Sequence, residues 1–104
     1  MFIHNTTFIV ERTLTVKFTE WARTVFIKAA HESGRFSSIT LTRILTQVDP
    51  DAVNFAIQMT STSLESAQQW HDDVATLLKD DLAARLGRQR VMFFSTDMEV
   101  ISTC

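Results

Sequence analysis

Hydrophobic and polar positions along the chain follow two different periods, and each change of period marks a new element. The residues between 2 and 11 are mostly β-branched or aromatic, with large apolar side chains at even and odd positions, which is typical of a strand with two apolar faces. Further on, apolar residues recur every three or four positions in two long runs, the pattern of an amphipathic helix. Alternation returns between and after these runs. The order is therefore β-α-β-β-α-β, with elements predicted over residues 2–11, 15–33, 36–47, 53–60, 64–86 and 91–100.

Residues that interrupt regular structure stand where this order requires a change of direction. The chain holds two glycines, Gly34 and Gly87, and each closes a helical run. Its single proline lies in Asp49-Pro50-Asp51, where proline presets the backbone of a turn and the first aspartate can accept a hydrogen bond from the chain beyond it. Thr62-Ser63-Leu64-Glu65 has the spacing of a capping box, so we expect Thr62 to cap the second helix.

The order of elements predicts an α+β fold of the ferredoxin-like type, in a single domain over residues 1–104. Right-handed crossovers place both helices on one face of a four-stranded antiparallel sheet, which leaves the other face without cover. Because the first strand is apolar at both parities, that bare face carries either Ile3 and Ile9 or Phe2 and Phe8, and the sequence leaves the choice open. We therefore expect a homodimer of the dimeric α/β-barrel type, joined through the sheet face.

Composition and charge narrow the classes of partner. The 104 residues are 45% hydrophobic and carry a net charge of −2 at pH 7. This charge, with the basic residues scattered, disfavours nucleic acid and anionic membranes as partners, because both require a concentrated basic surface. No apolar run approaches the roughly 20 residues needed to span a bilayer, and residues 1–10 lack the basic leader of a signal peptide. The single cysteine, Cys104, cannot pair within the chain, and we expect a cytoplasmic protein.

Five segments, by their order and spacing, give the chain a resemblance to a known family. They are Ile3–Glu11 (IHNTTFIVE), Ser33–Phe36 (SGRF), Phe55–Met59 (FAIQM), Ser63–Ser66 (SLES) and Phe93–Val100 (FFSTDMEV). Together they resemble a bacterial family of small domains of unknown function. The resemblance covers about residues 2–101 and implies a ferredoxin-like fold of the kind that assembles into dimeric α/β barrels. Members of that family tend to carry His-x-Pro on the first helix, where this chain has Phe26-Ile27-Lys28.

Other proteins of this architecture match the residues less well. An RNA-recognition module carries a basic-Gly-aromatic sequence with stacking aromatics on the third strand, and Asn54–Met59 lacks it. A metal carrier needs paired cysteines, and this chain has one cysteine. The chain more closely resembles dimeric-barrel monooxygenases that degrade heme, through Asn5 and Ser63–Ser66. Such enzymes carry Trp and an iron-ligating His where this chain has Ala67 and Leu77.

Neutral polar residues on the strands are the main candidates for a binding site. If they share the face turned away from the helices, they line the inside of the dimer and can hydrogen-bond a small ligand. A partly hydrated interface with satisfied hydroxyl and amide groups is the alternative. None of them is a general base or a nucleophile without help, so we rank binding above catalysis. The candidates are Asn5, Thr7, Thr40, Thr42, Asn54 and Gln58.

Two histidines, His4 and His71, are the alternative polar candidates. His4 lies in a strand among apolar neighbours, where a hydrogen-bonded core or interface histidine is the commoner role. His71 belongs to Trp70-His71-Asp72-Asp73, and on a helix that turns Trp70 toward the core we expect the other three on a solvent-exposed face. Lys79 and the arginines that follow it suit the negative end of the second helix dipole.

The sequence contains no catalytic motif, metal-ligand spacing or phosphate-binding loop, so we assign no catalytic residue, metal or cofactor. We interpret the protein as a homodimeric ligand-binding or interaction module and rank this role above that of an enzyme. The alternative hypothesis is a dimeric α/β-barrel monooxygenase-like enzyme that acts on a small organic or heme-type substrate. Such an enzyme would use Asn5 together with His4 or His71.

Overall fold

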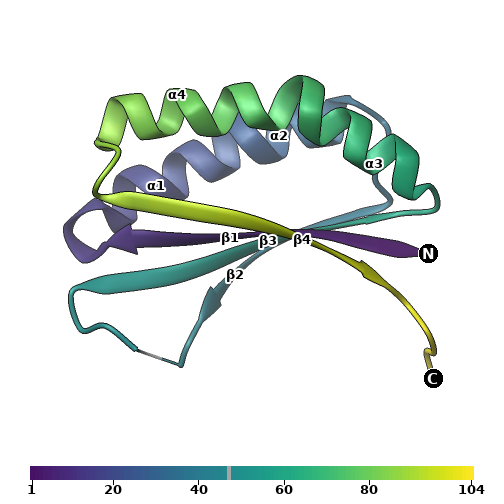
Figure 1. Cartoon of the computed structure of the whole chain (residues 1–104), viewed down its shortest axis with the longest axis horizontal. Helices are drawn as coiled ribbons and strands as arrows, with labels where there is room; N and C mark the ends of the chain where they lie inside the picture. The colour runs from purple at the N-terminus through teal and green to yellow at the C-terminus, as the bar shows by residue number, and fades with distance from the viewer. Residues whose placement is uncertain (47) are drawn as a thin grey trace.

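The computed structural model describes residues 1–46 and 48–104. Within this range four strands form one sheet, and two helical segments, each made of shorter pieces, connect them (Figure 1). The strands are β1 (Phe2–Glu11), β2 (Ser38–Ile44), β3 (Ala52–Ser61) and β4 (Val91–Glu99). The first helical segment consists of η1 (Arg12–Leu14), α1 (Thr15–Trp21), η2 (Ala22–Ile27) and α2 (Lys28–Glu32), and the second of α3 (Leu64–Trp70), η3 (His71–Ala75) and α4 (Thr76–Leu86).

The sheet has the strand order β2-β3-β1-β4, and each neighbouring pair is antiparallel. Figure 1 shows both helical segments on the same side of the sheet, which leaves the other side open. This arrangement confirms the predicted α+β ferredoxin-like fold. The central strands β1 and β3 pair over their full length, from Phe2 opposite Ser61 to Glu11 opposite Ala52.

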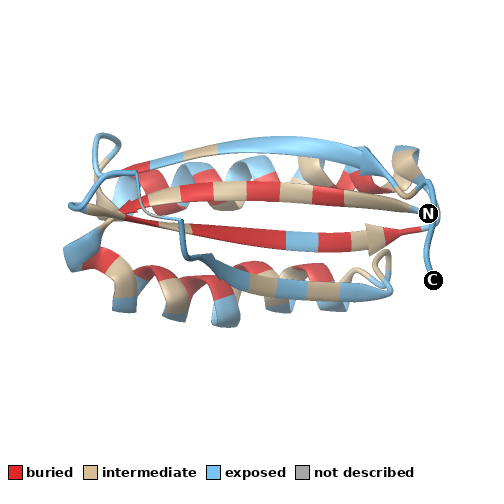
Figure 2. Cartoon of the chain, turned by 90° about the horizontal axis from the view of Figure 1, so that it is seen from below, coloured by how far each residue is buried: buried red, intermediate tan, exposed pale blue. Residues whose placement is uncertain are grey.

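The register also decides which side of β1 faces the helices. Phe8 and Val10, at even positions, are fully buried beneath the helices. Ile3 and Ile9 lie on the open side and are only partly buried. Figure 2, which views the open side, shows this alternation of buried and partly exposed residues along the central strands. The core therefore lies between the helices and the even-numbered side of β1, where the Phe8 ring packs 5.0 Å from that of Phe18, centroid to centroid.

The hairpin between β2 and β3 forms where the sequence predicts it. Asp49 Oδ1 accepts a hydrogen bond from the Asp51 backbone N–H at 2.8 Å, which confirms the turn role of Asp49. β2 is shorter than its predicted range of 36–47, since pairing with β3 runs only from Ser38 to Ile44. Gln47, at the end of the predicted range, lies outside the described residues.

The predicted cap of the second helical segment is wrong by one residue. Ser63, rather than Thr62, is the N-cap of α3, and its hydroxyl accepts a hydrogen bond from the Ser66 N–H at 3.1 Å. The shift follows from the end of β3, because the Ser61 hydroxyl accepts from the Ser63 N–H at 3.1 Å and donates to the Ser63 carbonyl at 3.0 Å. Thr62 is thereby held in the connection, before the first helical turn.

A wide turn changes which residues of the second helical segment face the sheet. In η3 the backbone hydrogen bonds are of the π type, so one extra residue is accommodated in the turn. The buried stripe consequently steps five residues, from Trp70 to Ala75, and continues through Lys79 and Leu82. Leu77, which the regular period places in the stripe, is 69% exposed. The π turn thus brings Lys79 under the helix.

Candidate functional site

The six polar candidates of the strands all lie on the open face of the sheet. Antiparallel pairing arranges this face in rows that cross the strands in the order β2, β3, β1, β4. Asn5 and Gln58 are directly opposite each other in the most polar row. The rows are Ser38-Thr60-Ile3-Met98, Thr40-Gln58-Asn5-Thr96, Thr42-Ala56-Thr7-Phe94 and Ile44-Asn54-Ile9-Met92.

These rows contain no charged residue in the described strands. The charged residues Arg43, Asp97 and Glu99 take the opposite parity, that of the helix-covered side. Glu11, at the end of β1, shares the parity of the open face, but its carboxylate is bound by Arg90 at 2.9 Å. Soluble sheet faces in contact with water usually carry charges, so an uncharged face indicates a surface that is covered.

Large apolar side chains stand exposed on the same face, along the edge strand β4. Met92 is 61% exposed, Phe94 is 55% exposed and Met98 is also solvent-accessible, while Ile44 is exposed at the opposite edge of the sheet, on β2. Figure 2 shows β4 as an almost continuous exposed strand beside the half-buried β1. Exposed apolar side chains gathered along one strand, beside a polar centre, are typical of an interaction surface.

The Asn5 side chain is incompletely hydrogen-bonded within the polar centre. Its amide Nδ2 donates to the Thr7 hydroxyl at 3.1 Å. Its carbonyl Oδ1 is shielded from solvent and has no hydrogen-bond partner among the described residues. An acceptor left in this state costs free energy until a donor reaches it. An occupant of the open face would supply such a donor after a rotation of the amide.

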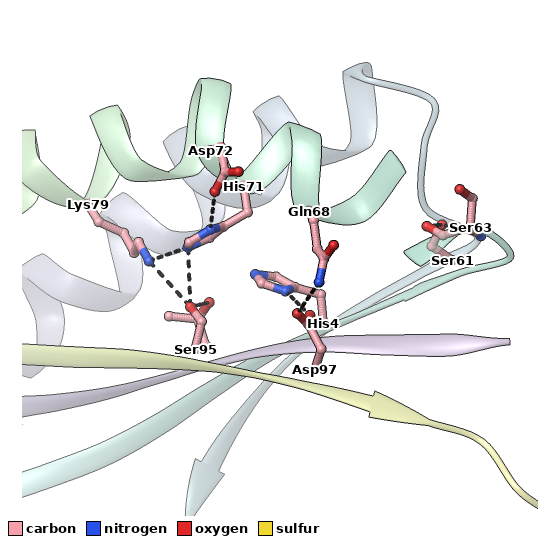
Figure 3. Close-up of polar contacts among 10 residues, drawn as sticks. His4, Ser61, Ser63, Gln68, His71, Asp72, Lys79, Ser95 and Asp97 are labelled. Carbon is pink, nitrogen blue, oxygen red and sulfur yellow. Dashed lines mark hydrogen bonds and ion pairs between the residues drawn. The ribbon is translucent and has the colours of Figure 1, made fainter. Parts of the chain in front are cut away.

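A second group of polar side chains lies on the other side of the sheet, beneath α3, η3 and α4 (Figure 3). His4 is only 3% exposed, and its Nδ1 lies 2.5 Å from Asp97 Oδ1 on the neighbouring strand. Gln68 Nε2 donates to the other carboxylate oxygen of Asp97 at 3.2 Å. The hydrogen-bonded core role expected for His4 is confirmed. Its Nε2, however, has no partner among the described residues.

His71 and Lys79 complete this group from the helical side. The rings of His4 and His71 are 4.8 Å apart, centroid to centroid. Lys79 Nζ lies 2.7 Å from His71 Nε2 and donates to the Ser95 hydroxyl at 3.3 Å. An ammonium donor at His71 Nε2 leaves the imidazole proton on Nδ1, which faces Asp72 Oδ1 at 3.4 Å. We call His4, His71, Lys79, Ser95 and Asp97 the helix-side cluster.

Burial and charge shift the protonation equilibria of this cluster. Burial lowers the pKa of Lys79 below that of a free lysine. Burial also lowers the pKa of His71, and the positive charge of Lys79 lowers it further. Burial acts to raise the pKa of Asp97, but the hydrogen bonds from His4 and Gln68 outweigh it and leave the pKa below its ordinary value. At neutral pH the Asp97 carboxylate is thus held charged, while the charged forms of His71 and Lys79 are disfavoured.

Comparison with known proteins shows the family of the chain. The model of the family described as Domain of unknown function (DUF4286) matches residues 1–101. The chain belongs to this family. No curated protein matches it.

Solved structures share the fold of this DUF4286 chain. A protein of Deinococcus radiodurans, whose name assigns it to the antibiotic biosynthesis monooxygenases, has a TM-score of 0.77 at 14% identity and covers 100% of this chain and 96% of its own. An ethyl tert-butyl ether d (ethd) family protein from Bacillus halodurans has a TM-score of 0.67 at 14% identity, covering 97% and 100%. A dimeric ferredoxin-like protein from an uncultured marine organism has a TM-score of 0.65 at 9% identity, covering 100% and 98%. At these identities the likeness shows the fold alone.

The DUF4286 chain separates the candidates that the enzyme hypothesis combines. Asn5 and His4 are consecutive in β1, so their side chains point to opposite sides of the sheet. Asn5 lies on the open face, whereas His4 and His71 belong to the helix-side cluster. A single site on one side of the sheet therefore cannot contain both Asn5 and one of the two histidines.

Two expectations about the second helix of the DUF4286 chain are wrong. His71 does not share the solvent-exposed face of Asp72, because the π turn rotates His71 toward the sheet. Lys79 is buried at 5% exposure beside His71 rather than lying free at the helix end. A separation of eight residues in a regular helix leaves two side chains about 80° apart, so the spacing alone does not predict the pair, and the π turn brings both to the sheet.

Across 1–46 and 48–104, no group of three or more His, Cys, Asp or Glu side chains is arranged to hold a metal ion. In the same residues no helix is both long and apolar enough to cross a bilayer.

Proposed function

We propose that this chain is a homodimeric binding module of the bacterial cytoplasm, whose two copies pair through their open sheet faces. The six polar residues at the centre of that face then lie inside the dimer, where they hydrogen-bond a small uncharged ligand. The observation that carries the proposal is the composition of the open face, which has no charge in its four rows and leaves Met92 and Phe94 more than half exposed. The single free cysteine, Cys104, is compatible with the reducing location.

The size of the open face supports pairing between two copies. Strands of seven to ten residues form the sheet. With strands about 4.8 Å apart and a rise of about 3.4 Å per residue, the face projects to roughly 600 Å². Stable complexes bury about 800 Å² of accessible surface per partner, and a side-chain surface exceeds its projection. A second copy therefore covers a face of suitable size, and neutral faces meet without charge repulsion.

The polar centre explains why such a dimer would also bind a ligand. Two flat apolar faces would exclude water, whereas amide and hydroxyl groups at the centre need partners once they are covered. Asn5 Oδ1 already lacks one among the described residues. Because no charge lies in the four rows, the ligand chemistry that fits is an uncharged molecule with hydrogen-bonding groups.

Charge reversal of the surface tests the pairing. Phe94→Glu places a carboxylate in the middle of the proposed interface, whereas Leu77→Glu places one on the exposed helix surface. Sedimentation at micromolar concentration should give twice 11.9 kDa for the native chain and for Leu77→Glu, and 11.9 kDa for Phe94→Glu. A native chain that sediments as a single copy would contradict the proposal.

Ligand binding requires a separate measurement. Asn54→Leu and Gln58→Leu replace two amides of the polar centre with apolar groups of similar size. A panel of uncharged amides and polyols is screened by the melting temperature of the native dimer. The proposal predicts that a stabilising compound loses its effect in both variants while the dimer persists. Stabilisation that survives both substitutions would place the ligand elsewhere.

A monooxygenase-like enzyme is the second candidate function, and the helix-side cluster favours it. The cluster supplies acid–base groups at the partly exposed edge strand β4, which the open face lacks. Titration with heme or flavin separates the two functions. A Soret or flavin shift that disappears in Asn5→Ala assigns the cofactor to the open face, and one that disappears in His71→Ala assigns it to the cluster. No shift from a tight dimer favours the binding module.

A further inference from the structure

We propose that Lys79 is a nucleophile that captures small uncharged aldehydes as an imine, with His71 as its acid–base partner. The inference is independent of the proposed dimer, since the helix-side cluster lies on the other side of the sheet from the open face. It rests on the burial of the amine, on the atoms that surround it and on the access from β4.

Lys79 is a buried amine without a carboxylate partner. Among the described residues no carboxylate oxygen lies within 4.0 Å of its Nζ. Nζ instead contacts His71 Nε2 and Ser95 Oγ, and it lies 5.2 Å from the centre of the Phe93 ring. Lysines that serve only as structural cations bury their charge beside an anion. Burial without an anion favours the neutral, nucleophilic amine.

His71 is placed to take the proton that the amine releases. Its Nε2 is 2.7 Å from Lys79 Nζ, which is hydrogen-bonding distance for direct transfer. The ring is buried on the side of His4 but reaches solvent with about a fifth of its side chain, so a proton can leave. The titratable groups around it are Lys79, His4 and Asp72, and Asp97 contacts His4 on the side away from His71. This arrangement resembles the acid–base pairing that activates nucleophiles in general.

Access to Lys79 defines the class of substrate. Ser95 lies on the edge strand β4 and is exposed to solvent, and its hydroxyl contacts both Lys79 and His71. A carbonyl compound that enters at this edge meets the Ser95 hydroxyl, which can donate to the carbonyl oxygen. Because Lys79 is only 5% exposed, the compound has to be small. The nearby carboxylates of Asp72 and Asp97 disfavour an anionic one.

The reaction needs no oxidant or reductant. The neutral amine of Lys79 attacks the aldehyde carbon, so that a C–N bond forms as the carbonyl π bond breaks, and His71 carries one amine proton to the oxygen, which becomes a hydroxyl. His71 then carries the second amine proton to that hydroxyl, the C–O bond breaks to release water, and the nitrogen lone pair completes the C=N bond. The sum is aldehyde plus amine giving imine plus water, with the imine held on Lys79.

Reductive trapping tests the proposal, because the chain has three lysines and two of them are matched controls. Lys17 and Lys28 are exposed on the first helical segment. The native chain is incubated with propanal and cyanoborohydride at pH 7, and peptide mapping gives the rate of modification at each lysine and at the Met1 amine. An exposed lysine is about one part in 2,500 neutral at this pH. Lys79 should be modified faster than either control, because its lowered pKa raises the fraction of neutral amine and His71 lies at hydrogen-bonding distance.

Two further labelling experiments test whether the preference for Lys79 requires the fold and whether it requires His71. Unfolded in urea, the three lysines should react at equal rates, which shows that the preference requires the fold. In His71→Gln, general acid–base catalysis is lost, so modification of Lys79 should slow by about 100-fold, and its pH profile should no longer show the titration of His71. Equal rates at the three lysines in the folded chain would overturn the proposal. An unchanged rate and pH profile in His71→Gln would overturn the role of His71.

Discussion

Replacing Lys79 with methionine should stabilise the fold at neutral pH. The methionine side chain keeps most of the volume and flexibility of lysine but removes the charge. Lys79 is 5% exposed and lacks a carboxylate partner among the described residues, so its ammonium loses hydration on folding with little in return. The two partners of Lys79 keep other hydrogen-bond partners in the variant. The Ser95 hydroxyl is 3.0 Å from the Thr6 hydroxyl, and His71 is partly exposed to solvent.

The expected magnitude follows from the balance of desolvation and hydrogen bonding. Exchange of buried charged groups for apolar ones of similar size is often neutral or stabilising by about 1–4 kcal/mol. The two hydrogen bonds of Lys79 offset part of this, since each contributes about 1 kcal/mol. We therefore expect a gain of about 1 kcal/mol at pH 7, or about 4–8 °C in melting temperature for a domain of this size.

The pH dependence of unfolding tests the sign of this stability difference separately from its magnitude. The pKa of Lys79 is lower in the folded chain than in the unfolded chain. Between the two pKa values the unfolded chain binds more protons, so the stability of the native protein rises with pH until about 10.4. Lys79→Met lacks this rise, and its advantage should shrink as the pH increases from 7 to 10.

Urea unfolding at a fixed protein concentration measures both effects, with Lys28→Met as the control for an exposed lysine. Lys28→Met should change the stability by less than about 0.5 kcal/mol at every pH. A loss of stability in Lys79→Met that is the same at pH 7 and pH 10 would refute the reasoning. It would mean that the ammonium is stabilised where it lies.

Three further predictions concern single contacts. Ser63→Ala should cost about 1 kcal/mol of unfolding free energy by removing the α3 cap, whereas Thr62→Ala should be nearly neutral; equal effects would contradict the assigned cap. Gly87→Ala should cost about 1–3 kcal/mol and more than Gly34→Ala in urea unfolding. Both glycines have a positive φ, +108 and +70, but a Cβ at Gly87 also lies 3.1 Å from the Arg90 side chain, whereas one at Gly34 meets no neighbouring atom within 4 Å. Asp97→Asn should lose about 1 kcal/mol of unfolding free energy at pH 7. Because the folded pKa of Asp97 is lowered, the native chain should lose stability as the pH drops below about 3.9, and the variant should not, which acid titration followed by circular dichroism measures.

The order of elements could be predicted because local signals agree with the fold. The period of the apolar residues distinguishes the strands from the helices, and Gly34 and Gly87 both adopt positive φ at the helix ends, where side chains are disfavoured. The parity of β1 could not be predicted, since Phe8 and Ile9 are both large and apolar. Only pairing with β3 and β4 shows that Phe8 is buried and Ile9 faces outward.

The two candidate sites differ in how far the sequence reveals them. The polar set of the open face follows from alternation, because Asn54 and Gln58 share a parity in one strand and Asn5 falls opposite Gln58 once the register is known. The helix-side cluster depends on the π turn, which has no signature in residue types. A regular period directs Leu77 inward, and the extra residue in the turn places Lys79 there instead.

Methionine oxidation by hydrogen peroxide tests the central claim, that a second copy covers the open face. The chain has four methionines, and in the single copy Met92 is 61% exposed, Met1 is 58% exposed and Met59 is fully buried. If two copies pair, Met92 in the native chain at micromolar concentration should oxidise much more slowly than Met1, and it should approach the rate of Met1 on dilution or in Phe94→Glu. Oxidation of Met92 as fast as Met1 at every concentration would show that the open face is bare.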